Sequence, residues 1–464
     1  MSWNAGGTAA IVVFIVGLVS DGLAEEAGKK VYPIDLPTVL QLTGAQNLDI
    51  QIARERLAEA KANHESARER FFPWLNVGAT YRRHDNRLQD VEGRILDVNK
   101  QSYTAGATLT AQVDLGDAIY QTLAAHQLVR VAGHAFEAQR QDSLLAAAQG
   151  YFDLAKAQAT VGVAREAVRI SQDYQNQLHQ AVTIGIAFKG DELRVRVETE
   201  RNQLALRQAL EQARIAAARL SQILHLDATV ELIARESDLA PLAIVKNDSA
   251  IEMLVAQAIT SRPELKQNQA LVVAAHKTKE GTIYGPLIPT LGVQVFAGGL
   301  GGGVGGATGN FGESEDYVAG LSWRIGPGGL LDFGRIHASE SRLRGAQLFG
   351  EKLKDEITRQ VVESHTRVRS LADQLTTTKL ALGTAEEAFR LTRARKEFAV
   401  GNVLENIQAE QELTRVRTDY FNVVAEYDKA QYVLERAVGA LPSSLSNQDE
   451  ESTLLDKQIN QGAK

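Results

Sequence analysis

The sequence of 464 residues contains no cysteine and only nine prolines, and its formal net charge is −7. Without cysteine there can be no disulfide, thiolate zinc site, iron–sulfur cluster or cysteine nucleophile. The mildly acidic charge gives no electrostatic footprint for nucleic acid, so we expect no DNA or RNA partner. The nine histidines form no pair three or four residues apart, so the sequence does not support a metal site on a helix. We expect no metal and no cofactor.

The sequence also lacks an apolar run long enough to cross a membrane as a helix. The run from Ala9 to Val19 has about 11 residues, whereas a spanning helix needs about 20. This length and the small residues of Gly22-Leu23-Ala24 are typical of a signal peptide, although no lysine or arginine precedes the run. We therefore expect residues 1–24 to be a signal peptide and the protein to be exported.

The prolines leave two very long segments uninterrupted. The segments from about Asp117 to Val182 and from Ile336 to Ala399 are rich in alanine, glutamine, arginine and glutamate, which favour helix. As continuous helices each would rise roughly 95–100 Å. Globular proteins rarely contain helices of this length.

The apolar residues in these segments are spaced by alternating steps of three and four. This heptad spacing predicts a narrow seam of helix packed on helix, with wide polar faces left exposed to water. The seam positions are Leu206, Leu210, Ala213, Ala217, Leu220 and Leu224 in the first half, and Leu371, Leu375, Thr378, Leu382, Ala385, Phe389, Thr392, Leu413, Val416, Tyr420, Val423, Tyr427, Ala430, Leu434 and Ala437 in the second.

The chain is an internal duplication, because matching features recur about 216 residues apart. Each half reads as helix, two strands, long helix, turn and helix. We expect a first repeat at 25–226, a linker at 227–250, a second repeat at 251–440 and a polar tail at 441–464. The matched features are Asn47-Leu48-Asp49-Ile50 with Arg262-Pro263-Glu264-Leu265, Pro73-Trp74-Leu75 with Pro289-Thr290-Leu291, Asp114-Leu115-Gly116 with Asp332-Phe333-Gly334, and Val182-Thr183-Ile184-Gly185 with Phe398-Ala399-Val400-Gly401.

Two strands are expected in each half, near 74–84, 103–115, 290–298 and 316–326. Between Tyr103 and Leu115 apolar and polar residues alternate, with Leu109 on the apolar face. Such alternation is found both in membrane β-barrels and in half-buried antiparallel sheets. Four strands cannot close a membrane barrel, so a membrane location requires several subunits to share one barrel.

On these residues the chain resembles the TolC-like outer-membrane efflux proteins over nearly its whole mature length. The resemblance rests on the duplication and on four motifs, Arg262-Pro263-Glu264-Leu265, Pro289-Thr290-Leu291, Leu331-Asp332-Phe333-Gly334-Arg335, and Phe398-Ala399-Val400-Gly401 followed by Ala409-Glu410-Gln411-Glu412-Leu413. It implies a mainly α protein with membrane β-strands, in which a homotrimer forms a twelve-stranded β-barrel in outer-membrane lipid. Long helices would continue this barrel as an α-helical barrel across the periplasm.

The resemblance also implies a periplasmic tip with an acidic constriction. Gly185 and Gly401 mark the tip turns where an adaptor would dock, and Asp191, Glu405 and Gln408 lie at the gate positions. Three-fold symmetry would bring three Glu405 carboxylates to one axis, which favours cations. The alternative is that Asp191 and Glu405 only begin helices, where an acid complements the helix dipole. The second turn is about two residues shorter than in many relatives, and Gln408 replaces an acid.

Two literal matches to catalytic motifs do not indicate catalysis. Gly301, Gly303 and Gly306 satisfy G-x-G-x-x-G, but the segment leads into an acidic loop and a strand rather than a helix. We expect Gly298 to Gly306 to form a flexible hairpin between strands. The triplet Asp332-Phe333-Gly334 lacks the other motifs of a kinase and is interpreted as a strand-to-helix turn. We therefore expect no enzymatic activity.

The expected function is that of an exit duct in a tripartite efflux or type I export system. Such a duct is located in the outer membrane, extends into the periplasm, and works with a periplasmic adaptor and an inner-membrane transporter. The alternatives are a periplasmic adaptor, which would carry a lipoyl-like or β-barrel segment, and a structural coiled-coil protein of the envelope, which would lack strand pairs. The duplicated strand pair favours the duct.

Overall fold

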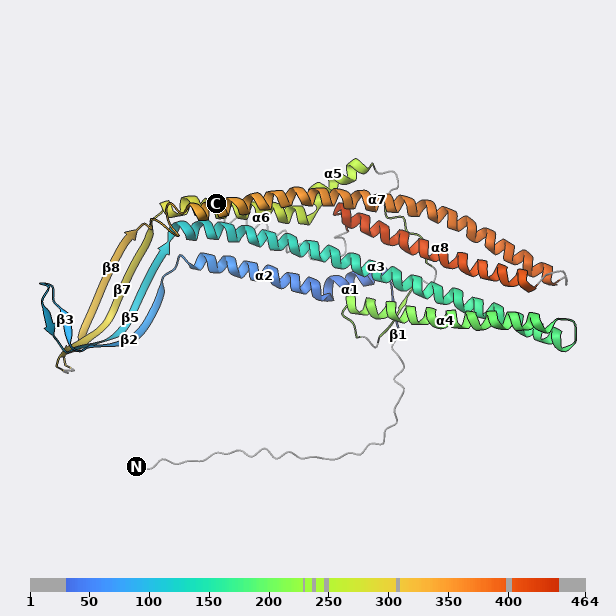
Figure 1. Ribbon diagram of the computed structural model, residues 1–464, viewed down its shortest axis with the longest axis horizontal. Helices are drawn as coiled ribbons and strands as arrows, with labels where there is room; N and C mark the ends of the chain where they lie inside the picture. Colours follow the sequence, from blue (N-terminus) through green and yellow to red (C-terminus); the bar gives the residue numbers. More distant parts are fainter. Residues whose placement is uncertain are drawn as a thin grey trace, which may run out of the picture.

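The computed structural model shows an elongated molecule with a β-sheet at one end and long helices running away from it (Figure 1). The structure describes residues 31–227, 230–235, 239–245, 250–305, 309–397 and 403–441. The expected signal peptide, Gly401 and all but the first residue of the expected polar tail lie outside these residues. In the described part of the chain, no helix combines the length and apolar character of a membrane span.

The two halves of the chain repeat the same elements in the same order. The first half contains α2 (Leu48–Glu69), β2 (Trp74–His84), β5 (Lys100–Asp114), α3 (Leu115–Thr183) and α4 (Lys189–Ile223). The second half contains α6 (Pro263–Tyr284), β7 (Thr290–Val304), β8 (Gly312–Ser322), α7 (Phe333–Glu397) and α8 (Val403–Val438). Because α3 has 69 residues and α7 has 65, each long helix is roughly 100 Å in length.

An aspartate directly precedes each long helix: Asp114 is the last residue of β5, and Asp332 lies in the connection after β8. The Asp114 carboxylate accepts a hydrogen bond from the backbone N–H of Asp117 at 3.1 Å. The Asp332 carboxylate accepts one from the N–H of Arg335 at 3.0 Å and one from the N–H of Gly328 at 2.9 Å. The bonds from Asp117 and Arg335 are N-caps, which satisfy backbone donors that the first helical turn leaves free, whereas the bond from Gly328 fixes the turn before α7. Asp332-Phe333-Gly334 is therefore a strand-to-helix turn, as predicted.

The sheet contains four antiparallel strands in the order β2, β5, β7, β8. The two inner strands have 15 residues each and the two edge strands have 11. Register places Leu75, Leu109, Val295 and Tyr317 opposite one another across the sheet. Directly opposed residues point to the same face, so the apolar alternation of the separate strands joins into one continuous apolar face.

The part of the glycine-rich segment from Gly298 to Val304 is strand, in contrast to the predicted flexible hairpin, while Gly306 lies outside the described residues. β7 continues through it to Val304, and Gly298 to Gly303 pair with β5. Glycine permits this close pairing, because a Cβ atom at Gly301 would lie 2.6 Å from the ring of Tyr103. That ring stacks on Phe311 with 5.7 Å between centroids. The aromatic rings supply the packing that glycine lacks.

The structure contains several short strands and helices that we did not predict individually from the sequence. β1 (Val31–Ile34) pairs in parallel with β6 (Glu231–Ala234), so the expected linker contains a strand. The other short elements are the hairpin of β3 (Arg87–Gln89) and β4 (Ile95–Asp97), α1 (Leu36–Gln46), α5 (Ile251–Ser261) and the 3-10 helix η1 (Gly285–Leu287). The short strands and η1 contain three or four residues each, too few to show a hydrophobic period in the sequence.

The main core lies in the middle of the molecule, where α1, α3, α4, α8, β1 and β6 meet. Fully buried side chains there include Leu154 of α3, Leu220 of α4 and Val424 of α8. A second core joins α5, α7 and α8 through Ile357, Val361 and Leu434 together with their neighbours. These cores fix the point from which the helix pairs α3/α4 and α7/α8 extend away from the sheet (Figure 1).

Burial along the helix pairs follows most of the predicted seam. On α7, Leu371 and Thr392 are buried and Leu375 and Leu382 are partly buried, while most residues between them are exposed. On α4 the prediction is wrong at Leu210, which is exposed; Ala209 is buried in its place against α3. A helix with 3.6 residues per turn drifts away from a strict heptad, so the contacting position moves by one residue.

Candidate functional site

The candidate site is the tip, the end of the molecule farthest from the sheet, where α3 is followed by α4 and α7 by α8 (Figure 1). Gly185 lies in the first of these turns with φ of 78°, a conformation that glycine adopts without strain. Its N–H donates to the carbonyl of Val182 at 3.0 Å, which ends α3. Ile184, Ile186 and Phe188 around it are exposed.

A small apolar cluster fastens the starts of α4 and α8 to α3. It contains Tyr174 and Leu178 of α3, Val195 of α4 and Ile407 of α8. This cluster places the first turns of α4 and α8 at the same end of the molecule. The candidate gate residues of the two repeats are therefore brought to one region of the fold.

Asp191 lies in the first turn of α4, where its carboxylate pairs with Arg194 at 3.1 Å. Its neighbour Glu192 is buried and accepts hydrogen bonds from Lys189 at 2.5 Å and from His179 at 2.9 Å. The Lys189 and His179 bonds lower the pKa of Glu192 below its usual value. Glu192 thus ties the end of α3 to the start of α4, a role that the sequence did not indicate.

Glu405 lies in the first turn of α8, and its carboxylate accepts a hydrogen bond from Arg395 of α7 at 2.8 Å. Gln408, one turn later, is exposed. The carboxylate of Glu405 is therefore partly neutralised within the subunit, and it links the two helices of the second repeat. Both Asp191 and Glu405 also occupy the helix-start positions of the alternative interpretation.

The pKa of Tyr174 is changed by burial and by the charged groups between these helices. Burial, and then the nearby Asp191 carboxylate, raise the pKa of Tyr174 to about 12. A hydrogen bond with Asn406 opposes this change. The phenol thus stays neutral and connects α3 to α8 beside the candidate gate.

A buried carboxylate, Glu410, lies about one turn further along α8. Its side chain is 4% exposed and accepts a hydrogen bond from Asn202 of α4 at 3.2 Å. Glu198, also buried, lies beside it and pairs with Arg201 at 3.8 Å. Burial, and then the charge of Glu198, raise the pKa of Glu410 to about 7. The Ala409-Glu410-Gln411-Glu412-Leu413 motif contained this residue, but only the fold shows its burial.

This pKa predicts that Glu410 contributes less to the stability of the protein as the pH rises. Because the folded-state pKa of Glu410 is raised from 4.5 to about 7, the folded state binds the proton more tightly than the unfolded state. The contribution of Glu410 to stability should therefore fall between pH 4.5 and 7, by up to about 3 kcal/mol per copy. Glu410→Gln should remove this fall, as measured by the thermal unfolding midpoint across this pH range. A variant with the same pH dependence as the wild type would contradict the assignment.

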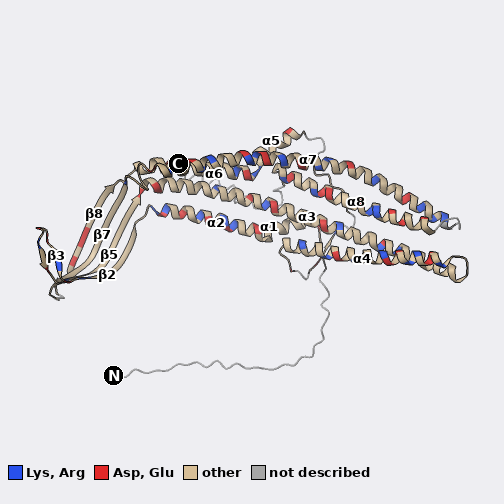
Figure 2. Cartoon of the chain, viewed as in Figure 1, with Lys and Arg blue, Asp and Glu red and all other residues tan. Residues whose placement is uncertain are grey.

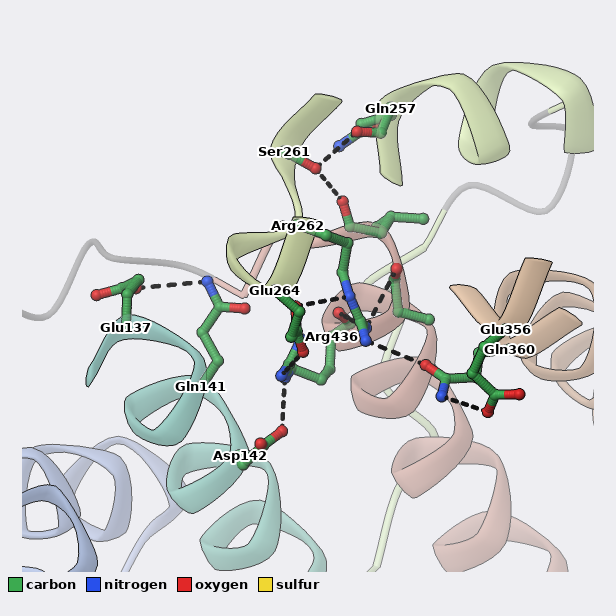
Figure 3. Close-up of polar contacts among 12 residues, drawn as sticks. Glu137, Gln141, Asp142, Gln257, Ser261, Arg262, Glu264, Glu356, Gln360 and Arg436 are labelled. Carbon is green, nitrogen blue, oxygen red and sulfur yellow. Dashed lines mark hydrogen bonds and ion pairs between the residues drawn. The ribbon is translucent and has the colours of Figure 1, made fainter. Parts of the chain in front are cut away.

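A second polar cluster lies near the middle of the molecule, on the predicted Arg262-Pro263-Glu264-Leu265 motif (Figure 3). Arg262 is 6% exposed and donates to the backbone carbonyls of Arg436 at 2.9 Å and Ala437 at 3.4 Å. Its guanidinium also donates to Gln360 of α7 at 3.1 Å and pairs with Glu264 at 3.1 Å. Arg262 thus caps the C-terminal end of α8, which would otherwise leave carbonyls without partners.

Arg436, which is 5% exposed, completes this cluster from α8 (Figure 3). It pairs with Glu264 of α6 and with Asp142 of α3, the latter at 2.8 Å. Burial opposes ionisation of Glu264, but the hydrogen bond and charge of Arg436, with the charge of Arg262, lower its pKa below the usual value. The cluster joins α3, α6, α7 and α8 and is a structural centre rather than a binding site.

The described residues show no grouping of three histidine or acidic side chains suited to hold a metal ion. The charged side chains are distributed along the helices, whereas the sheet carries few of them except on β8 and near the end of the sheet remote from the helices (Figure 2). Among the described residues, the polar contacts of the tip are therefore ion pairs and hydrogen bonds of carboxylates, several of them buried.

Residues 39–224 match the sequence model of the family described as "Outer membrane efflux protein". A search of the curated proteins found no match. Among solved structures, a membrane protein from Pseudomonas aeruginosa is similar with a TM-score of 0.73 and 20% identity, covering 91% of this chain and 97% of that one. The Campylobacter jejuni CmeC outer membrane channel has a TM-score of 0.76 and 13% identity, covering 90% and 88%. The Neisseria gonorrhoeae MtrE outer membrane channel has a TM-score of 0.70 and 14% identity, covering 89% and 91%.

These matches confirm the predicted resemblance to TolC-like outer-membrane efflux proteins. The matched family and the channel structures are transport proteins rather than enzymes, in agreement with the prediction of no enzymatic activity. Their descriptions place them in the outer membrane, which agrees with the predicted location. At these levels of identity the solved structures establish the fold, which is mostly helical as predicted.

Proposed function

We propose that the protein is the outer-membrane exit duct of a tripartite efflux or type I export system. Three copies would form one barrel and conduct substrates passively from an inner-membrane pump through the periplasm and the outer membrane. The observation that carries this proposal is an open four-stranded sheet, with one apolar face, at the end of helices about 100 Å long.

The open edges of the sheet require further strands. In lipid, unpaired backbone N–H and C=O groups cost several kcal/mol each, so a membrane sheet must close on itself. The smallest membrane barrels have about eight strands, and one chain supplies four. Three chains supply twelve, and the edge strands of 11 residues have the length of a tilted membrane strand, about 9–11 residues.

The helical part suits a duct that crosses an aqueous compartment. α3/α4 and α7/α8 bury narrow seams and leave wide polar faces, which can contact water both outside and inside a tube. The exposed Ile184, Ile186 and Phe188 at the Gly185 turn supply an apolar surface for a periplasmic adaptor. Gly401 would mark the corresponding turn of the second repeat.

The gate of this duct would lie at the tip, with Asp191, Glu405 and Gln408 around its axis. The Arg395–Glu405 ion pair supports this proposal, because it connects the end of α7 to the start of α8 where the opening would be narrowest. Breaking it would free the start of α8 to move outward. The partners would be two further copies, the adaptor and an inner-membrane transporter.

Conductance in planar bilayers tests both the duct and the gate. Purified wild-type protein should form cation-preferring pores of low conductance. Glu405→Ala should increase the conductance and weaken the cation preference, because a carboxylate and an inter-helix ion pair are lost from each copy.

Asp419→Ala is the matched control for the gate variant. Asp419 is also on α8 and pairs with Arg415 at 3.9 Å, but it lies roughly 20 Å along the helix from Glu405. This control should conduct like the wild type. A wild type without pores would argue against the duct, whereas pores that Glu405→Ala leaves unchanged would argue only against the gate assignment.

A further inference from the structure

The two edges of the sheet carry opposite charges at the same end. At the end remote from the helices, β2 carries Arg82 and Arg83 just before its last residue, and β8 carries Glu313, Glu315 and Asp316 among its first five residues. The acidic residues of β8 stand out on the sheet (Figure 2). We call these five side chains the rim charges.

Register assigns the rim charges to the two faces of the sheet. Val77, Ala107, Ala297 and Glu315 are opposed across the four strands, so Glu315 is on the apolar face. Alternation along β2 puts Arg83 on this same face, as it puts Glu313 there on β8. Arg82 and Asp316 both occupy the opposite face. Each face therefore has a cation on one edge and an anion on the other.

Two of the five rim charges have partners within one chain, and three have no ion pair among the described residues. Arg83 pairs with Asp85 at 2.8 Å, and Glu315 accepts a hydrogen bond from Tyr317 at 2.9 Å. Among the described residues, no side chain of opposite charge lies within ion-pair distance of Arg82, Glu313 or Asp316. Free charges on two edges of equal length indicate a partner that supplies the opposite charge.

We propose that β2 of one copy pairs with β8 of the next copy through a seam that the rim charges select. The inference rests on the proposed shared barrel and identifies the contact that closes it. With the helices of all copies on one side, β2 and β8 run antiparallel, and their charged ends meet at the same rim. Arg83 then lies near Glu313 or Glu315, and Arg82 lies near Asp316.

The same charges oppose the incorrect pairings. Two β2 edges with their helices on one side would be parallel and would bring arginines together, and two β8 edges would bring acids together. Like charges directly opposed across strands are destabilising. A slip by one residue would also move the apolar residues of one copy to the polar face of the next. The seam therefore specifies a head-to-tail ring, in which every edge is paired with its complement.

Charge reversal tests the seam through the temperature at which the detergent-purified oligomer dissociates. The variant with Arg82→Glu and Arg83→Glu should dissociate at a temperature lower by about 5 °C or more. The variant with Glu313→Lys, Glu315→Lys and Asp316→Lys should show the same loss. Combining all five substitutions should restore most of the dissociation temperature, since opposite charges then meet again with their signs exchanged.

The control variant reverses two charges away from the edges. It carries Lys100→Glu, on the inner strand β5 at the same rim, and Arg94→Glu, which follows Gly93 in the β3–β4 hairpin. Its oligomer should dissociate like the wild type. Single-edge variants with unchanged dissociation, or a combined variant without recovery, would overturn the seam. A wild type that is monomeric would overturn the shared barrel itself.

Discussion

Replacing Leu109 with arginine should prevent assembly in the outer membrane. Leu109 lies on the apolar face of the sheet between Leu75 and Val295, and this face would contact lipid in the proposed barrel. A cation facing the bilayer midplane costs about 2–4 kcal/mol, and less near the interfaces. Three copies would carry three such charges, so we expect little Leu109→Arg protein in the outer-membrane fraction of a Gram-negative host.

The neighbouring position supplies the control. Thr110 lies on the polar face between Trp74 and Gln294, so Thr110→Arg should face the water-filled interior and assemble normally. Size, charge and position along the strand are almost the same in the two variants, and only the face differs. Normal assembly of Leu109→Arg together with failure of Thr110→Arg would show that the faces are assigned in reverse.

The second large effect is expected from Arg436→Met. This change leaves the buried Glu264 with Arg262 as its remaining cation and removes the link to Asp142. Loss of one partner of a buried ion pair is destabilising by about 3–5 kcal/mol. The thermal unfolding midpoint of the detergent-solubilised protein, followed by its helical circular dichroism, should fall markedly.

Two comparisons isolate the cause of this loss. Arg415→Met removes an exposed arginine from the same helix and should cost no more than about 1 kcal/mol. Adding Glu264→Gln to Arg436→Met removes the poorly compensated carboxylate and should recover part of the loss. Equal midpoints for Arg415→Met and Arg436→Met would contradict the importance of the buried cluster.

The pH dependence gives an independent check on the cluster. The lowered pKa of Glu264 means that its stabilising contribution is fully present above its unfolded value near 4.5. This contribution is lost as the pH falls through the folded-state pKa. Arg436→Met should therefore lose less stability than the wild type on acidification below pH 4.5.

The order and approximate lengths of the main helices and strands were predictable from the sequence, because they depend on the spacing of apolar residues and prolines. Alternation across Tyr103 to Leu115 predicted the apolar face, and the absence of proline predicted two helices whose ends lie within a few residues of α3 and α7. Aspartates before Leu115 and Phe333 were recognisable as a repeated feature, and both cap helices. Each of these signals is local in sequence.

The remaining features depend on contacts between distant segments. Arg262 and Glu264 were visible as a motif, but their partners Arg436 and Asp142 lie more than a hundred residues away. The parallel pairing of β1 with β6 likewise joins segments about two hundred residues apart. Neither hydrophobic periodicity nor helix-capping residues indicate which distant segments contact each other.

At the tip, sequence reasoning found the helix starts but not their partners. Asp191 and Glu405 were identified by their place after the turns. The pairing of Glu405 with Arg395 depends on the packing of α7 against α8, and the burial of Glu410 depends on the packing of α4 against α8. The glycine-rich part of β7 was misassigned because it pairs with β5, where Tyr103 is about two hundred residues away in sequence.

Because α3 is one continuous helix of 69 residues, a small rotation at its middle would be amplified into a larger displacement at its end. The helix would rotate about the central core around Tyr151, and from there it continues for about 50 Å to the tip turn. A rotation of only about 5° at that core would displace the tip by about 4 Å, more than the diameter of a water molecule. Three such helices around one axis would convert slight repacking at the middle of the molecule into a large change in the opening at its end.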